Sequence, residues 1–126
     1  MTTTMTASIE QFCWRFLHNH RDYKHLYDIL DGYSDTFLQI DLCEMIADKE
    51  TFKTRFRTIC FVVLRDKCSH AAYVLSILGF ALHVHTKCRS LEWYNVETLT
   101  ILLIEILTCI NFDTTLFVKY DSCVIL

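Results

Sequence analysis

The chain has 126 residues, of which 52% are apolar, and a formal net charge of −3. This length suits one domain with a buried core, and the near balance of cations and anions gives no strong attraction for nucleic acid. The absence of proline, together with only two glycines, argues against disorder and against turn-rich β-folds. We therefore expect one all-helical domain over residues 1–126 and no nucleic-acid partner.

The first ten residues have neither the basic segment nor the apolar run of a secretory signal, so we expect the protein to stay inside the cell. Seven cysteines are spread along the chain without a C-x-x-C pair. In a reducing compartment such cysteines are typically small buried apolar side chains. We expect no disulfide framework.

The first predicted helix starts at a capping box, in which Ser8 caps the first turn and Gln11 reaches back. It runs to about Arg21 with one apolar face, formed by Ile9, Phe12, Cys13, Phe16, Leu17 and His20. The next helical stretch crosses Gly32, which indicates a break or a close approach of backbones. Its apolar positions are Leu26, Ile29, Leu30, Tyr33 and Phe37.

Two further capping signals follow. Asp41 predicts a short helix through Ala47, and Asp48 or Thr51 predicts a longer helix that ends at the polar residues 65–67. The longer helix has helically spaced apolar residues, namely Phe52, Phe56, Ile59, Cys60, Val63 and Leu64.

Ser69 is the predicted cap of a helix over residues 70–85 that is apolar nearly all round. Such a helix needs neighbours on every side, and it is too short to span a bilayer, so we place it at the centre of an orthogonal bundle. Asn95 caps the last long helix, in which Glu105 must reach solvent or a partner. Asn111 then restarts a short helix over residues 114–120.

Residues 56–75 resemble the segment of Bcl-2 proteins that joins their fourth and fifth helices. The match without gaps is at Phe56, Ile59, Cys60, Val63, Leu64, Arg65 and Asp66. Residues 26–33 are similar to the third homology motif of the same family, with Leu, Ile and Tyr at the expected spacing. The short chain and the missing loop after helix one are most similar to viral Bcl-2 homologues of large DNA viruses.

This resemblance implies a Bcl-2-like orthogonal helical bundle around a central hydrophobic helix. It also implies that the protein inhibits apoptosis by sequestering the BH3 helices of pro-apoptotic host proteins in an apolar groove. The groove residues that it implies are Tyr33, Phe37, Ile59, Val62, Val63, Ala72 and Leu75. Ordinary core packing explains each of these positions equally well.

One departure from the family concerns its ligand-pairing Arg, which is Ala72 in this chain. Either Arg55 or Arg65 substitutes for that ion pair with the ligand, or the groove binds fewer ligands through apolar fit. The alternative function is a Bcl-2-fold scaffold that does not bind through a groove and blocks innate immune signalling through its surface. An unrelated helical enzyme or lipid carrier is a third hypothesis, and it would have a closed internal cavity.

The resemblance places the protein in the host cytoplasm, or at a mitochondrial or other membrane surface. An empty apolar groove would also expose enough surface to favour a homodimer. The C-terminal Cys123-Val-Ile-Leu126 fits a geranylgeranylation signal, so a membrane partner is expected only if Cys123 is prenylated. A packed aliphatic tail is the simpler interpretation.

We find no motif typical of an enzyme and therefore expect no catalytic residues and no cofactor. His83, His85 and Cys88 have the residue types of a zinc site, yet the two histidines are on different faces of a helix. We expect no metal site.

Overall fold

The computed structural model describes residues 2–18, 20–32, 37, 40–43, 45–66 and 69–112, and all regular secondary structure in these ranges is helical. The protein is therefore all-α. In chain order the elements are α1 (Thr2–His18), the 3₁₀ turn η1 (His20–Tyr23), α2 (Lys24–Asp31), α4 (Lys49–Thr58), the π-helical turn η2 (Ile59–Val63), the 3₁₀ turn η3 (Leu64–Asp66), α5 (His70–Cys88) and α6 (Val96–Cys109). The predicted helix at 114–120 and Cys123 lie outside the described residues.

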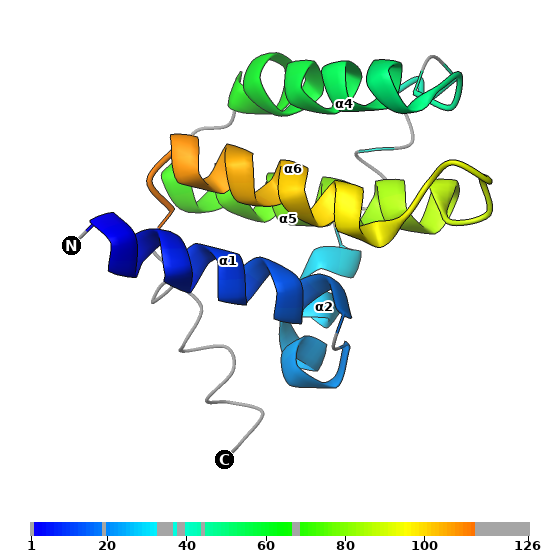
Figure 1. Ribbon diagram of the computed structural model, residues 1–126. Helices are drawn as coiled ribbons and strands as arrows, with labels where there is room; N and C mark the ends of the chain where they lie inside the picture. The colour runs from blue at the N-terminus through cyan, green and yellow to red at the C-terminus, as the bar shows by residue number, and fades with distance from the viewer. Residues whose placement is uncertain are drawn as a thin grey trace.

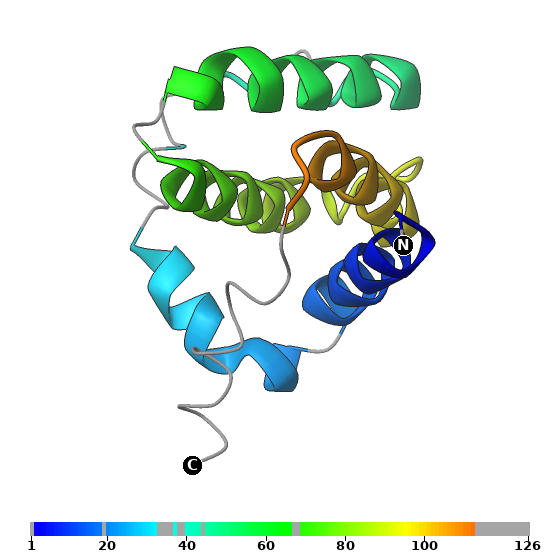
Figure 2. The same cartoon turned by 90° about the vertical axis from the view of Figure 1, so that its left-hand side faces the viewer.

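The helices form three layers, with α5 and α6 side by side in the middle (Figures 1 and 2). Helix α4 lies on one side of this pair, and α1 and α2 lie on the other. The closest packing partner of α1 is α6, whereas α2 packs on α5. The sequence placed one helix at the centre, but the centre is shared by two. Among the described helices, none is long and apolar enough to cross a membrane.

Helix α5 confirms the predicted central helix. The Ser69 hydroxyl caps it by accepting a hydrogen bond from the Ala72 amide at 3.1 Å. The helix continues one turn beyond the predicted end, to Cys88, because Val84 and Cys88 are both buried on its inner face. Its buried residues are Val74, Ser76, Ile77, Leu78, Gly79, Phe80, Ala81, Val84 and Cys88.

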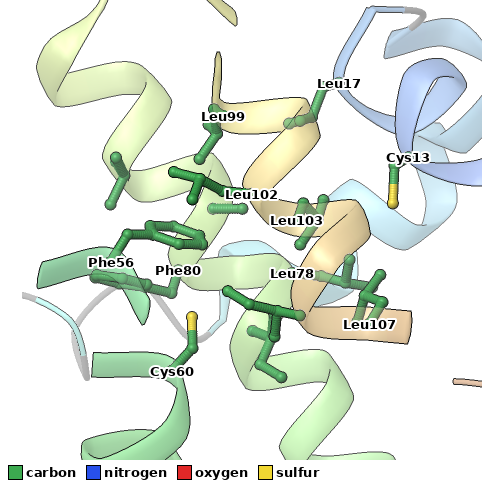
Figure 3. Packing of buried hydrophobic residues seen from close by; sticks show 14 of the residues in the cluster. Cys13, Leu17, Phe56, Cys60, Leu78, Phe80, Leu99, Leu102, Leu103 and Leu107 are labelled. Atoms are coloured by element: carbon green, nitrogen blue, oxygen red, sulfur yellow. The ribbon is translucent and has the colours of Figure 1, made fainter. Parts of the chain in front are cut away.

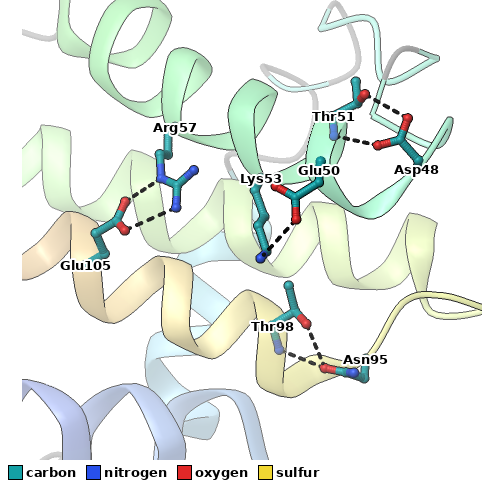
Figure 4. Close-up of polar contacts among 8 residues, drawn as sticks. All are labelled: Asp48, Glu50, Thr51, Lys53, Arg57, Asn95, Thr98 and Glu105. Carbon is teal, nitrogen blue, oxygen red and sulfur yellow. Dashed lines mark hydrogen bonds and ion pairs between the residues drawn. The ribbon is translucent and has the colours of Figure 1, made fainter.

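Helix α6 begins at the predicted cap and ends in a way that the sequence did not predict. The Asn95 side-chain oxygen accepts a hydrogen bond from the Thr98 amide at 2.8 Å (Figure 4). Asn111 has a positive φ of 54°, and the Phe112 amide donates to the Leu107 carbonyl at 2.9 Å. This is a Schellman ending, in which a left-handed residue closes the helix. Asn111 therefore ends α6, and the helix that we predicted to follow it at 114–120 lies outside the described residues.

Helix α4 starts at Asp48, whose carboxylate accepts a hydrogen bond from the Thr51 amide at 2.8 Å (Figure 4). Of the two predicted starts, Asp48 is thus the cap. The short helix predicted from Asp41 to Ala47 is wrong for the described residues there, which form turns. The Asp41 carboxylate accepts from the Cys43 amide at 2.9 Å, and this local hydrogen bond favours a turn over a helix.

The first helix starts at Thr2, so Ser8 lies inside α1 and is not its N-cap. A capping box is a local signal, and adding a turn to an already nucleated helix costs little free energy. The helix also ends earlier than predicted, at His18, because the chain tightens into η1 before Arg21. The predicted apolar face is nevertheless confirmed, since Ile9, Phe12, Cys13, Phe16 and Leu17 are all buried.

Aromatic rings connect the layers through the core. Phe56 of α4 stacks on Phe80 of α5 with ring centroids 5.4 Å apart (Figure 3). Phe80 also contacts Phe37 at 5.7 Å, and Phe56 contacts Phe52 at 6.3 Å. Phe52 in turn packs edge-on against Trp93 at 5.4 Å. This row of rings holds α4 against α5 and the connection that precedes α6.

Candidate functional site

The structure divides the predicted groove residues between the core and the surface. Phe37 and Ile59 are 1% and 0% exposed, so both belong to the hydrophobic core. Tyr33 lies outside the described residues. Val62 and Val63, in contrast, are 63% and 50% exposed. The most exposed side chains on η2 are therefore the two valines.

The π-helical turn explains why these valines face solvent. The apolar periodicity predicted a continuous α-helix through Val63, whereas the structure has a π-helical turn over Ile59–Val63. A π turn accommodates one extra residue, which rotates the following side chains relative to the α-helical pattern. Ile59 and Leu64 stay buried at its two ends, while Val62 and Val63 are displaced outward.

Helix α5 supplies the other two predicted groove residues. Ala72 and Leu75 are both partly exposed on its N-terminal half. The hydroxyl of Tyr73, between them in sequence, donates a hydrogen bond to the Cys60 carbonyl of η2 at 2.7 Å. This bond holds the start of α5 against the π turn. We call Val62, Val63, Ala72 and Leu75 the η2–α5 surface.

The two candidate cations differ in position. Burial raises the pKa of Tyr73, and the nearby Arg65 guanidinium offsets part of that rise. Arg65 is exposed, and its effect on Tyr73 places it near the start of α5. Arg55 is half-buried in α4, near Asp41. The hydrogen bond from the Cys43 amide lowers the pKa of Asp41 most, and the charge of Arg55 lowers it further.

A pocket of about 710 Å³ lies between the end of α1, α2 and the C-terminal half of α5. Sequence reasoning did not find it. Its lining residues are Leu17, His18, Tyr27, Asp28, Leu30, Asp31, Gly79, Leu82, His83, His85, Thr86, Lys87 and Arg89. A usable signal was present in α5, where Gly79, His83 and Lys87 recur every four residues and so share one face.

His83 and His85, which line the pocket, have lowered pKa values. Burial lowers the pKa of His83, and the charge of Lys87 lowers it further. Burial also lowers the pKa of His85, with smaller contributions from Arg89 and His18. The Nδ1 atom of His85 lies 2.7 Å from the Tyr94 hydroxyl. Both imidazoles are therefore mostly neutral at pH 7.

Another buried polar group beside the pocket is Tyr27. Burial raises its pKa to about 12, and its hydroxyl donates a hydrogen bond to the Phe16 carbonyl at the end of α1. This bond joins α2 to α1 next to the pocket. A neutral tyrosine already engaged in this way forms part of the wall.

The described cysteines are free thiols, namely Cys13, Cys43, Cys60, Cys88 and Cys109. Burial raises the pKa of Cys13 and Cys60 far above the usual range, so neither is an available thiolate. Within the described ranges, no three His, Cys, Asp or Glu side chains come close enough to hold a metal ion.

Comparisons with known protein families, with curated proteins and with solved structures find no match for this chain.

Proposed function

We propose that the protein is a viral Bcl-2-like inhibitor of apoptosis that holds an amphipathic BH3 helix of a pro-apoptotic host protein on the η2–α5 surface. The observation that carries this proposal is the exposure of two adjacent valines, 63% and 50%, beside the central helix. Exposed apolar side chains grouped on a folded domain are typical of a binding surface. The proposal also rests on the resemblance of residues 56–66 to the corresponding Bcl-2 segment.

The chemistry of the surface suits an amphipathic helix. Apolar anchors of the ligand helix would cover Val62 and Val63, and burying the exposed part of each valine is worth about 1 kcal/mol. Arg65 is exposed and near Tyr73 of α5, so its guanidinium is free of the core and can pair with an Asp of the ligand. Arg55 is half-buried and near Asp41, so we assign the ion pair to Arg65.

The test is calorimetric titration with a peptide of about 25 residues that contains the Leu-x-x-x-Gly-Asp pattern. We expect a dissociation constant on the order of micromolar for the unchanged protein. Val62→Glu and Val63→Glu should each weaken binding by about tenfold or more, because a charge is placed against an apolar anchor. Both valines are exposed, so neither change should unfold the protein.

Ile101→Glu is the matched control, because Ile101 is an equally exposed apolar residue, at 59%, on α6. It should leave peptide binding unchanged. A charge swap tests the ion pair: Arg65→Glu should weaken binding, and a peptide with Asp→Arg should restore it. No binding across a panel of such peptides, or equal losses for Ile101→Glu and Val63→Glu, would contradict the proposal.

The second candidate function is a Bcl-2-like scaffold that acts through its surface against innate immune signalling. It is favoured by the burial of Phe37 and Ile59 in the core, which leaves a smaller apolar surface than the resemblance implied. This candidate predicts that the peptide panel fails while the folded protein still suppresses an immune-signalling reporter in cells. Val62→Glu would then leave the reporter effect unchanged.

A further inference from the structure

The pocket between α1, α2 and α5 lies apart from the residues of the η2–α5 surface, with which it shares no lining residue. Its volume of about 710 Å³ is within the range of sites for small molecules. The pocket is lined by the C-terminal half of α5, from Gly79 onward, whereas the η2–α5 surface includes residues of its N-terminal half. A ligand there would not compete directly with a bound helix.

The lining of this pocket is apolar in one part and charged in another. Leu17, Leu30 and Leu82 contribute aliphatic side chains, and Gly79 leaves space where another residue would place a side chain. Leu17 and Leu30 are mostly buried in the core, so the partly exposed Leu82 presents most of the aliphatic surface, with the edges of the other two beside it. An apolar chain in contact with these leucines would therefore be removed from water at little cost.

The charges in the lining balance. Lys87 and Arg89 supply two cations from the end of α5, and Asp28 and Asp31 supply two carboxylates from α2. The three lining histidines add hydrogen-bonding groups. A purely anionic ligand would pair with Lys87 and Arg89 but leave the α2 carboxylates without a partner charge from the ligand, and a purely cationic ligand would do the reverse. A head group that carries both charges can pair with the α2 carboxylates and with the cations of α5 at the same time.

We propose that this pocket binds a single-chain zwitterionic amphiphile, with its chain against Leu30 and Leu82 and its head group between the α2 carboxylates and the cations of α5. The anionic part of the head group faces Lys87 and Arg89, and the cationic part faces Asp28. This activity goes beyond the proposed helix binding, and either can exist without the other.

The experiment uses decylphosphocholine below its micellar concentration, titrated calorimetrically into the full chain. We expect one saturable site. Decyl phosphate, decyltrimethylammonium and phosphocholine alone should each bind about tenfold more weakly or worse, because each lacks one part of the match. Equal or tighter binding of either singly charged analogue would overturn the zwitterion assignment. Equal binding of phosphocholine alone would show that the apolar wall plays no part.

Two variants locate the binding site. Leu82→Trp fills the apolar part and should abolish saturable binding. Lys87→Glu alters an exposed residue, should not affect folding, and should weaken binding by about tenfold. Lys49→Glu is its control, because Lys49 is an exposed lysine at the start of α4 and away from the pocket. Equal effects of Lys87→Glu and Lys49→Glu would overturn the proposal.

A final arm separates this site from the helix-binding surface. Lys87→Glu should still bind the BH3-type peptide as the unchanged protein does, and Val63→Glu should still bind decylphosphocholine. If Val63→Glu abolished amphiphile binding, or if the peptide displaced the amphiphile stoichiometrically, the amphiphile would be on the η2–α5 surface and this proposal would fail.

Discussion

Glu105 of α6 forms an ion pair with Arg57 of α4. The sequence indicated that this carboxylate needs solvent or a partner, but it did not identify the partner. The Glu105 carboxylate oxygens accept hydrogen bonds from Arg57 Nε and Nη2 at 2.5 and 3.2 Å (Figure 4). The sequence predicted that Glu105 reaches solvent or a partner, and it does both, because its side chain is 42% exposed. Such a half-exposed pair contributes at most about 1 kcal/mol, so it orients α4 on α6 more than it stabilises the fold.

The partial burial of His85, whose ring contacts the Tyr94 hydroxyl, makes stability depend on pH. Burial lowers the pKa of His85 below 6.5, its value in the unfolded chain. As pH falls below 6.5, the unfolded state takes up a proton before the folded state does. We therefore expect the contribution of His85 to the free energy of unfolding to be constant well above this value and to decrease on acidification, until the pH falls below the folded pKa.

Replacement of His85 by Gln tests this expectation. Urea unfolding at about pH 7.5 and about pH 5 should show a smaller loss of stability for His85→Gln than for the unchanged protein. His83 has a pKa lowered in the same direction and contributes the remaining part. An identical pH dependence in the two proteins would contradict the assignment to His85.

At the scale of helices, three capping residues were predictable from the sequence because a cap depends on only a few neighbouring residues, whereas Ser8 and Asp41 were predicted as caps and are not. Ser69, Asp48 and Asn95 all act at the predicted positions. The π turn was not readable, because nothing in residues 59–63 distinguishes it from an α-helical turn. Tertiary contacts decided it: Ile59 and Leu64 both pack into the core, which requires one extra residue between them.

The N-cap of α6, Asn95, is expected to contribute measurably to the stability of the fold. Asn95 accepts hydrogen bonds from both the amide and the hydroxyl of Thr98, at 2.8 and 3.0 Å. Asn95→Ala removes both and should lower the free energy of unfolding by about 1 kcal/mol. Asn95→Asp keeps an acceptor and should retain most of the stability. If the urea midpoints of the Ala and Asp variants coincide, the side chain does not act as a cap.

At the scale of the whole molecule, Phe80 connects the layers by touching Phe56 and Phe37. Phe80→Ala leaves a large cavity in the middle of the row of rings and should cost about 3–5 kcal/mol. That is a large part of the stability of a domain of this size. We expect thermal unfolding of the variant to occur at a much lower temperature.

Two further variants make the Phe80 result interpretable. Phe80→Leu keeps most of the volume and should lose less stability than Phe80→Ala, which keeps the comparison measurable if the Ala variant does not fold. Ile101→Ala, at a residue 59% exposed, should change stability by less than about 0.5 kcal/mol. Equal losses for Phe80→Ala and Ile101→Ala would contradict the role of the aromatic row.

The sequence by itself determined the all-helical class, the caps at Ser69 and Asn95, and the buried faces of α1 and α5, and it narrowed the cap of α4 to Asp48 or Thr51. These features depend on residue type and on spacing along one helix, which the chain carries locally. The tertiary structure alone decided that α6 shares the centre with α5, that Val62 and Val63 face solvent, and that a pocket opens beside α5. Each of these depends on how helices distant in sequence pack together, and no local pattern records that packing.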